Sequence, residues 1–331
     1  MNDDEISRVI KTEDEDGIEA LFARARAARE ASYGKSVYLR GLIEFTNFCE
    51  NDCYYCGIRR SNTALNRYRL SLDEILNCCR AGSELGLKTF VLQGGEDPYF
   101  TADRVAEIVS AIRREFSGSA ITLSIGERAP ADYALFFRSG ANRYLLRHET
   151  ASDEHYKKLH PPSMRLSERK ACLYNLKKIG FQTGAGFMVG SPFQKPEHLL
   201  EDIRFLRELK PEMVGVGPFI PHNNTPFREK TAGSILLCLK MIAIVRVILP
   251  DALIPATTAM ETIAPNGREL AMSAGANVIM PNISPVSARK LYSIYNNKSY
   301  GAEDIEKNIS VLKEKIIASG LTPDFSRGDA R

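Results

Sequence analysis

The amino-acid sequence predicts an α/β fold, a closed (βα)8 barrel of the TIM type. Two observations lead to it: strand-like apolar runs recur along the chain, and segments of helical periodicity lie between them. The predicted barrel occupies residues 37–282, close to the ~250 residues typical of this fold. We expect residues 1–331 to be one domain, with a helical preface over 1–36 and a helical segment over 283–331. A doubly wound open sheet is the alternative if one weak run is not a strand.

The strands and helices are expected to alternate. The eight predicted strands span residues 37–45, 89–94, 121–126, 143–148, 183–190, 213–220, 253–260 and 277–282. Helices are predicted over residues 71–86, 101–116, 166–180, 196–210 and 234–249, where apolar residues recur at three- and four-residue spacing. Ser71, Thr101 and Ser167 are the expected N-caps. Because active sites of such barrels lie at the C-terminal ends of the strands, functional side chains are expected there.

Composition and charge narrow the class of protein. The chain has 44 basic and 41 acidic residues, and a net charge of +3 gives no global field to attract nucleic acid or an anionic membrane. The acidic N-terminus lacks the apolar core of a secretory signal, and segment 234–249 is too short and too interrupted by charge to cross a bilayer. Seven cysteines without framework spacing favour a reducing compartment. We therefore expect a cytoplasmic protein with no nucleic-acid or membrane partner.

Three cysteines lie close together after the first predicted strand. Cys49, Cys53 and Cys56 have the spacing C-x3-C-x2-C, which brings three thiols near enough to share one metal centre. A structural zinc site takes four protein ligands, and no fourth Cys or His lies within twenty residues of Cys56. A 4Fe–4S cluster ordinarily takes four thiolates, so three would leave one iron open to an exogenous ligand. The pattern favours a cluster over zinc, and zinc over three unrelated buried cysteines.

This cysteine triplet, with the aromatic Tyr55 just before its last member, resembles the motif of the radical S-adenosylmethionine (SAM) superfamily. Longer stretches are similar to one branch, the radical SAM maturase of FeFe-hydrogenase usually called HydE. They include CYYCGIRRSN, TFVLQGGEDPY, RYLLRHETA, MVGVGPFIPHNNTP and GANVIMPN, within residues 38–295. The methylornithine synthase branch is the main alternative, followed by the biotin synthase and tyrosine lyase branches.

The resemblance implies the cofactors. One 4Fe–4S cluster per chain would have three Cys ligands and one open iron, which binds the amino and carboxylate groups of SAM. An electron from an external donor, passed through the cluster, would cleave SAM to methionine and a 5′-deoxyadenosyl radical. The four other cysteines fall in helical patterns and are expected to be buried packing residues: Cys78, Cys79, Cys172 and Cys238.

Candidate SAM contacts end the second predicted strand, in the run from Gln93 to Glu96. Gly94 and Gly95 would let the backbone approach a ligand closely, and the Glu96 carboxylate can accept from an ammonium group. In the family that the sequence resembles, this glutamate contacts the methionyl amine of SAM. The same family pattern has serine where Gly94 stands.

The fourth predicted strand ends with Arg147, His148 and Glu149 in succession. Alternation sends Arg147 and Glu149 to one face, where a buried cation and carboxylate need partners, and His148 to the other as a packing residue. By resemblance Glu149 binds the ribose or the charged end of SAM and Arg147 faces the substrate; a structural Arg–Glu pair is the alternative. Arg169 matches the family arginine that clamps the SAM carboxylate, although Arg165 is nearby in sequence.

Further candidates are expected to point into the barrel. Ser124 on the third strand and Met188 on the fifth are candidate cofactor contacts. The candidate substrate contacts besides Arg147 are Thr122 on strand three, Thr257 and Thr258 on strand seven, Met280 on strand eight, and Tyr292 and Tyr295, three apart on a helix face.

These patterns leave three functions. The first is a maturase that helps to assemble the diiron site of FeFe-hydrogenase. By resemblance it would act on a small iron–cysteine complex bearing CO and cyanide, received from a tyrosine-lyase maturase and passed to a GTPase scaffold. The second is a radical SAM mutase or lyase acting on an amino acid, as in the methylornithine synthase branch. The third is a non-catalytic carrier of an Fe–S or organometallic fragment.

Overall fold

A parallel sheet forms the centre of the computed structural model, which describes residues 1–299, 301 and 304–331. The strands are β1 (Ser36–Leu39), β2 (Gly41–Thr46), β3 (Thr89–Gly94), β4 (Ala120–Ser124), β5 (Arg143–Leu145), β6 (Gln182–Val189), β7 (Met213–Pro218), β8 (Val278–Ile279) and β9 (Thr322–Asp324). Strands β2 to β7 form one sheet in sequence order, whereas β1 lies between β8 and β9 in a second parallel sheet. The expectation of an α/β fold built on parallel strands is confirmed.

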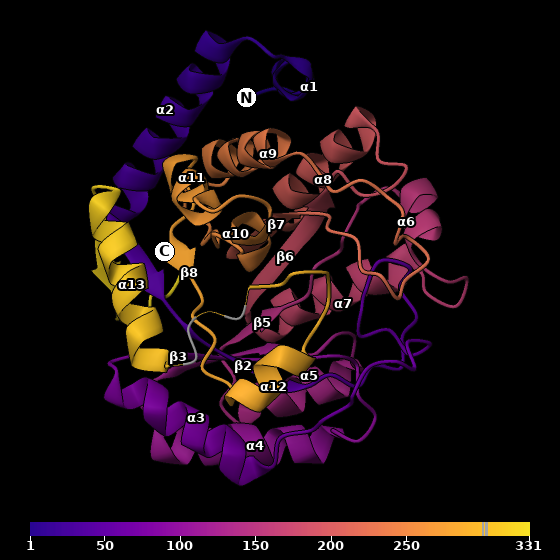
Figure 1. Ribbon diagram of the computed structural model, residues 1–331, viewed down its shortest axis with the longest axis vertical. Helices are drawn as coiled ribbons and strands as arrows, with labels where there is room; N and C mark the ends of the chain where they lie inside the picture. Colours follow the sequence, from indigo (N-terminus) through magenta and orange to yellow (C-terminus); the bar gives the residue numbers. More distant parts are fainter. Residues whose placement is uncertain (300, 302–303) are drawn as a thin grey trace.

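Helices surround the strands (Figure 1). They are α1 (Asp3–Lys11), α2 (Glu15–Tyr33), α3 (Leu72–Glu84), α4 (Ala102–Glu115), α5 (Pro130–Arg138), α6 (Asp153–Leu159), α7 (Leu166–Ile179), α8 (Pro196–Leu209), α9 (Ile235–Ile248), α10 (Thr258–Ile263), α11 (Gly267–Ser273), α12 (Val286–Leu291) and α13 (Ile305–Ala318). Ser71 and Thr101 cap α3 and α4 as predicted. Ser167 does not cap α7: the helix begins one residue earlier, at Leu166, and Arg165 is its N-cap, with no side-chain capping hydrogen bond.

The two sheets are joined by single bridges where the seventh predicted strand was expected. Leu253 bridges to Met213 of β7, and Pro255 bridges to Val278 of β8. The amide of Val214 donates to the carbonyl of Leu253 at 3.0 Å. The prediction of a regular strand over 253–260 is therefore wrong, because Pro255 has no amide hydrogen to extend a ladder and α10 begins three residues later.

Two strands end earlier than the sequence analysis predicted. The fourth predicted strand stops at Leu145 and the eighth at Ile279, so Arg147 and Met280 lie on loops just beyond them.

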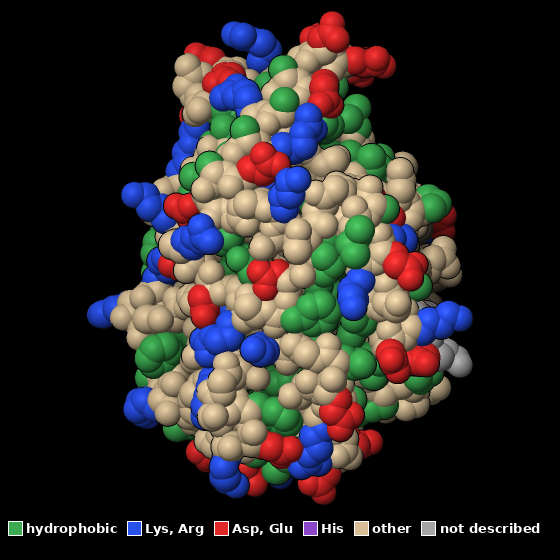
Figure 2. Space-filling view, turned by 90° about the vertical axis from the view of Figure 1, so that its left-hand side faces the viewer, with side chains coloured by type: hydrophobic (Ala, Val, Ile, Leu, Met, Phe, Trp, Pro, Cys, Tyr) green, Lys and Arg blue, Asp and Glu red, His purple; other side chains and the backbone are tan. Residues whose placement is uncertain are grey.

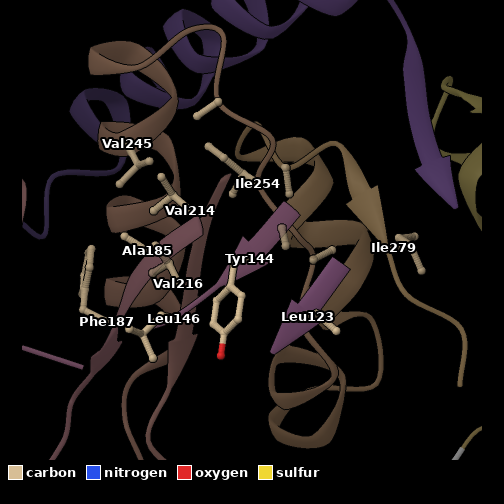
Figure 3. Close-up of a cluster of buried hydrophobic side chains, with 14 of the residues drawn as sticks. Leu123, Tyr144, Leu146, Ala185, Phe187, Val214, Val216, Val245, Ile254 and Ile279 are labelled. Atoms are coloured by element: carbon tan, nitrogen blue, oxygen red, sulfur yellow. The ribbon is translucent and has the colours of Figure 1, made fainter. Parts of the chain in front are cut away.

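The hydrophobic core fills both sides of the strands. Figure 3 shows Val245 of α9 beside Val214 of β7, with Tyr144 of β5 pointing between the strands. The Tyr144 hydroxyl donates to the carbonyl of Gly126 at 2.7 Å, which satisfies the polar end of a fully buried ring.

Within the predicted helical segment 283–331, the sequence indicates one helix over residues 302–320 followed by a polar end. Helix α13 is present, while the first two residues of that prediction, 302 and 303, lie outside the described residues. The polar end is in fact β9, which pairs with β1, followed by a tail that contacts the N-terminal ends of β5 and β6. There Asp329 forms an ion pair with the fully buried Arg143 at 2.7 Å, and the carbonyl of Gly328 accepts from Arg40 at 2.9 Å. The guanidinium groups needed partners, and the tail supplies them.

The outer surface carries mixed charge. Figure 2 shows basic and acidic side chains interspersed with small apolar areas on the face that it presents. Among the described residues, no helix combines the length and the hydrophobicity that crossing a lipid bilayer requires.

Candidate active site

Most of the predicted site residues meet in one cavity of about 280 Å³ at the C-terminal end of the six-stranded sheet. Its walls come from the ends of β3 to β7, the loops that follow β2 and several other strands, and the segment after α12. The predicted residues that line it are Cys49, Cys53, Tyr55, Cys56, Gln93, Gly94, Gly95, Glu96, Ser124, Arg147, Glu149, Arg169, Met188, Tyr292 and Tyr295. A concave site with a few convergent charged groups is typical of a small-molecule binding site.

The cysteine triplet lies on the loop between β2 and α3. The amide of Glu50 donates to the carbonyl of Glu96 at 2.8 Å, and the amide of Cys56 donates to the carbonyl of Cys53 at 3.3 Å. All three thiols are free. Burial raises the pKa of each thiol, that of Cys56 to about 12, so without a metal they carry their protons. Iron would displace these protons and compensate the buried thiolates.

The three cysteines all line the cavity, where they could meet either one metal ion or a cluster. Within the part of the chain that the structure describes, no set of three His, Cys, Asp or Glu side chains is arranged to hold a single metal ion. In a 4Fe–4S cluster the thiolates bind different irons, so the ligands surround the cluster instead of sharing one ion. The donor set therefore fits a cluster better than the zinc site that the sequence alone allowed.

Gly94 and Gly95 bring the end of β3 against the cysteine loop. A Cβ on Gly95 would lie 2.1 Å from the carbonyl oxygen of Phe48 and 2.7 Å from Cβ of Cys49. A Cβ on Gly94 would lie 2.6 Å from the methyl group of Thr46. The glycines are thus required for this close approach, and the serine expected from the family pattern would fit at Gly94 only if Thr46 moved.

Arg169 is buried between two carboxylates. Its Nε lies 2.7 Å from Glu127 Oε1, and its Nη2 lies 3.6 Å from Glu96 Oε1. Burial alone would lower the pKa of Arg169, but Glu127 and Glu96 hold it well above its ordinary value. Arg165 is exposed and lies outside the cavity, so Arg169 is the arginine placed to meet a ligand carboxylate.

Arg147 and Glu149 point into the cavity from the loop after β5. Arg147 Nη2 and Glu149 Oε2 form an ion pair at 3.0 Å, but neither atom has a well-directed hydrogen bond. Glu149 has a φ of 66°, which a non-glycine residue rarely adopts, and its amide donates to the carbonyl of Gly186 of β6 at 3.0 Å. A strained carboxylate with unused hydrogen-bonding capacity is typical of a ligand-binding position.

His148 faces away from the cavity, as predicted. Its Nε2 lies 3.2 Å from Asp202 Oδ1 of α8, and both side chains are fully buried. Burial lowers the pKa of His148 and raises that of Asp202. The pair holds the β5 loop against α8 and leaves the neighbouring residues, Arg147 and Glu149, on the cavity side.

Tyr292 and Tyr295 line the cavity, but they do not lie on a helix face as the sequence analysis predicted. Helix α12 ends at Leu291, so both tyrosines lie in the irregular segment that follows it. The amide of Gly57, next to the last cysteine, donates to the carbonyl of Ile294 at 2.9 Å. A Cβ on Gly57 would lie 2.1 Å from the carbonyl oxygen of Ser293. This tyrosine segment, residues 292–296, is therefore fastened directly to the cysteine loop.

Four predicted substrate residues lie outside this cavity. Thr122 and Met280 line a smaller cavity deeper between the strands, beside Arg40. Thr257 is the N-cap of α10 and Thr258 is its first residue, so neither lies on a strand. The sequence analysis misplaced these two because it read the apolar run through Pro255 as continuous β-structure.

Glu127 was missed. It follows Gly126 at the end of the third predicted strand and pairs with Arg169. A Cβ on Gly126, whose φ is 78°, would lie 1.9 Å from Cγ of Glu96, so only glycine lets this turn approach Glu96 so closely. The rule that directed attention to charged residues after strands two and four would have found this one after strand three.

Comparisons with known proteins agree with this geometry. Residues 43–206 match the model of the radical SAM superfamily. The chain is 48% identical over 280 residues to the FeFe-hydrogenase maturase subunit HydE of Thermotoga maritima, covering 85% of this chain and 80% of that protein. It is 31% identical over 329 residues to the 3-methylornithine synthase of Methanosarcina acetivorans, covering 98% and 90%.

A solved structure extends the likeness to three dimensions. The crystal structure of a methylornithine synthase superposes with a TM-score of 0.88 at 28% identity, covering 98% of this chain and 94% of that one. The cysteine triplet falls inside the matched superfamily region, and the maturase shares the higher identity. The chain belongs to the radical SAM superfamily and, within it, to the family of the FeFe-hydrogenase maturase HydE.

Proposed function

We propose that this protein is a radical SAM enzyme that acts in the assembly of the FeFe-hydrogenase active site. One observation carries the proposal: the cysteine triplet, Glu96, Arg169, Glu149, Arg147 and both tyrosines, which come from five separate parts of the chain, line a single cavity. When bound, a 4Fe–4S cluster and SAM supply the reductive cleavage that yields a 5′-deoxyadenosyl radical. The protein supplies ligands, orientation and a water-poor site.

Each charged residue has a role that follows from its position. The cysteine triplet would hold one cluster per chain and leave one iron for SAM. Arg169 would exchange its pairing with Glu127 for the SAM carboxylate, which its planar fork can meet with two hydrogen bonds. Glu96 would accept from the ammonium group of SAM. Glu149 would bind the ribose hydroxyls, with Gln93, Ser124 and Met188 completing the walls of the cofactor site.

The substrate would lie on the far side of SAM from the cluster, between Arg147 and the two tyrosines. By its kinship with the maturase, the substrate would be a small iron–cysteine complex bearing CO and cyanide. A cation at Arg147 suits such an anionic complex. The tyrosine-lyase maturase would deliver the substrate and the GTPase scaffold would receive the product.

A second candidate rests on the methylornithine synthases, which match nearly the whole chain in sequence and structure. In that case the enzyme would rearrange an amino acid, and Arg147 would hold the substrate carboxylate instead of an iron complex. The lower sequence identity, 31% against 48%, makes this the weaker candidate.

Two measurements test the proposal. The anaerobically reconstituted protein should cleave SAM to methionine and 5′-deoxyadenosine with dithionite as reductant; a carrier without enzymatic activity would not. Omitting this chain from an in vitro maturation mixture for FeFe-hydrogenase should abolish hydrogenase activity, and adding it back should restore that activity. Formation of methylornithine from an amino acid by the purified protein would instead favour the second candidate.

We also infer that the two sheets act as one (βα)8 barrel over residues 37–282, in a single radical SAM domain. The bridges at Leu253 and Pro255 and the hydrogen bond from the amide of Leu42 to the carbonyl of Pro281, at 2.9 Å, support this view.

A further inference from the structure

A groove of about 550 Å³ lies on the outer surface beside the cysteine loop. Residues of α6 and of the loop that leads to α7 line it, including Lys157, His160, Met164 and Arg165. In Figure 1 this part of the molecule lies near α6, at the right-hand edge. It is separate from the cavity described above, because the two share no lining residue.

The floor of this groove touches a cluster ligand. The sulfur of the half-buried Met164 lies 3.8 Å from the sulfur of Cys53. Tyr55, two residues further on, bonds to Nε2 of His160 at 3.1 Å, and His160 also lines the groove. A molecule bound in the groove would therefore be separated from the sulfur of Cys53 by only one side chain, that of Met164. The thioether of Met164 is polarizable.

Aromatic rings lead from the cysteine loop to the same face. The Tyr54 ring meets that of Phe227 edge to face, with centroids 6.1 Å apart, and Phe227 meets Phe193 in the same way at 6.1 Å. Phe193 is 50% exposed and has a φ of 66°. A phenylalanine at positive φ is strained, and such strain is concentrated where a ligand or partner binds.

Basic side chains surround the exposed ring and the groove. Lys158 and Lys230 place their ammonium groups 5.9 and 5.1 Å from the centre of the Phe193 ring. Lys157 and Lys158 are paired with Asp153 and Glu154 at 2.5 and 2.6 Å.

We call residues 153–167 with Phe193, Lys195 and Lys230 the basic face. It holds five basic and two acidic residues, an excess equal to the net charge of +3 of the whole chain. Two of its cations, Arg165 and Lys230, make no ion pair within the described residues. An acidic partner could therefore use them without first breaking an existing pair.

We propose that the basic face docks an acidic protein that carries one electron at low potential. The inference rests on the proposed function, since it concerns the source of the electron that the cluster needs. The reduced carrier loses one electron and the oxidised cluster gains it; no bond forms or breaks. Phe193 provides the apolar centre of a small transient interface, and the surrounding cations provide attraction at long range.

Charge reversal tests the docking. The variant Arg165→Glu, Lys195→Glu, Lys230→Glu is compared with Lys88→Glu, Arg114→Glu, Lys307→Glu, which changes the net charge equally at exposed positions before β3, on α4 and on α13. The probe is a purified acidic flavodoxin in its fully reduced form. At low salt, the first variant should bind it at least tenfold more weakly and accept electrons at least tenfold more slowly, whereas the control should stay within about twofold of the parent. Equal losses in both variants would overturn the proposal.

Dithionite separates the two proposals. It reduces clusters without docking, so the basic-face variant should retain parental SAM cleavage with dithionite. A parent chain that cleaves no SAM with dithionite but binds the flavodoxin as described refutes the proposed enzyme and leaves the docking surface standing. Loss of self-association in the basic-face variant, with unchanged flavodoxin binding, would show instead that the face joins two copies of this chain.

Phe193→Gly provides a variant that cannot be explained by misfolding. Glycine relieves the strain at φ 66°, so the urea midpoint of unfolding should stay the same or rise. Flavodoxin binding should nevertheless weaken several-fold, because the apolar centre of the face is gone. Unchanged binding in this variant would remove Phe193 from the interface.

Discussion

Replacing Arg169 by alanine should separate SAM binding from cluster assembly. The guanidinium is buried, lies 2.7 Å from Glu127 and 3.6 Å from Glu96, and touches none of the cysteines by ion pair or hydrogen bond. Its removal leaves two carboxylates close together with no cation between them and removes the fork for the SAM carboxylate. Loss of one partner of a buried charged contact costs about 2–5 kcal/mol, which corresponds to roughly 30- to several thousand-fold in affinity.

The assay is equilibrium binding of SAM to the anaerobically reconstituted protein, with the visible absorbance of the cluster as a control for assembly. Arg169→Lys keeps the charge but not the fork, so it should lose less affinity than Arg169→Ala. Arg165→Ala, four residues earlier and exposed, is the matched control and should bind SAM normally. Parental SAM affinity in Arg169→Ala, with the cluster intact, would refute the assignment of this residue as the carboxylate clamp.

Three further predictions concern other parts of the site. Cys53→Ala should abolish both the cluster absorbance and SAM cleavage, whereas Cys78→Ala, a buried helix position, should retain about four irons per chain; SAM cleavage by Cys53→Ala would contradict the ligand assignment. Gly57→Ala should displace the tyrosine segment, because the new Cβ would lie 2.1 Å from the carbonyl oxygen of Ser293. Amide hydrogen exchange in residues 292–296 should become faster while the cluster remains bound. Unchanged exchange would show that Gly57 does not hold the tyrosine segment against the cysteine loop. Burial lowers the pKa of His155 to about 4, so between pH 6.5 and pH 4 the unfolded chain takes up a proton at His155 that the folded chain does not, and the free energy of unfolding decreases as the pH is lowered. The urea midpoint of His155→Gln should therefore depend less steeply on pH over that range than the urea midpoint of the parent. An equal slope in both proteins would argue against His155 as a source of acid sensitivity.

How far the sequence predicts this structure depends on the range of the signal. The cysteine spacing, the glycine pair after β3 and the charged residues after β5 are local patterns, and the structure brings all of them into one cavity. Thr257 and Thr258 were misplaced because the end of a strand depends on hydrogen-bond partners elsewhere in the chain, which Pro255 limits. The partners of Arg143 come from the far end of the chain, so no window of neighbouring residues could reveal them.

Strand β1 has both of its neighbours in the last part of the sequence: β8 on one side and β9 on the other. During synthesis the backbone groups of β1 therefore have no strand to pair with until nearly the whole chain has left the ribosome. The sheet from β2 to β7 can assemble in order meanwhile, because each of its strands pairs with the next. If iron bound to the cysteine loop during synthesis, the tyrosine segment that packs over this loop would not yet be present to shield the iron from oxygen. Cluster insertion is therefore best suited to the finished polypeptide, and expression conditions that starve the cell of iron should yield a folded, metal-free protein that can be loaded afterwards.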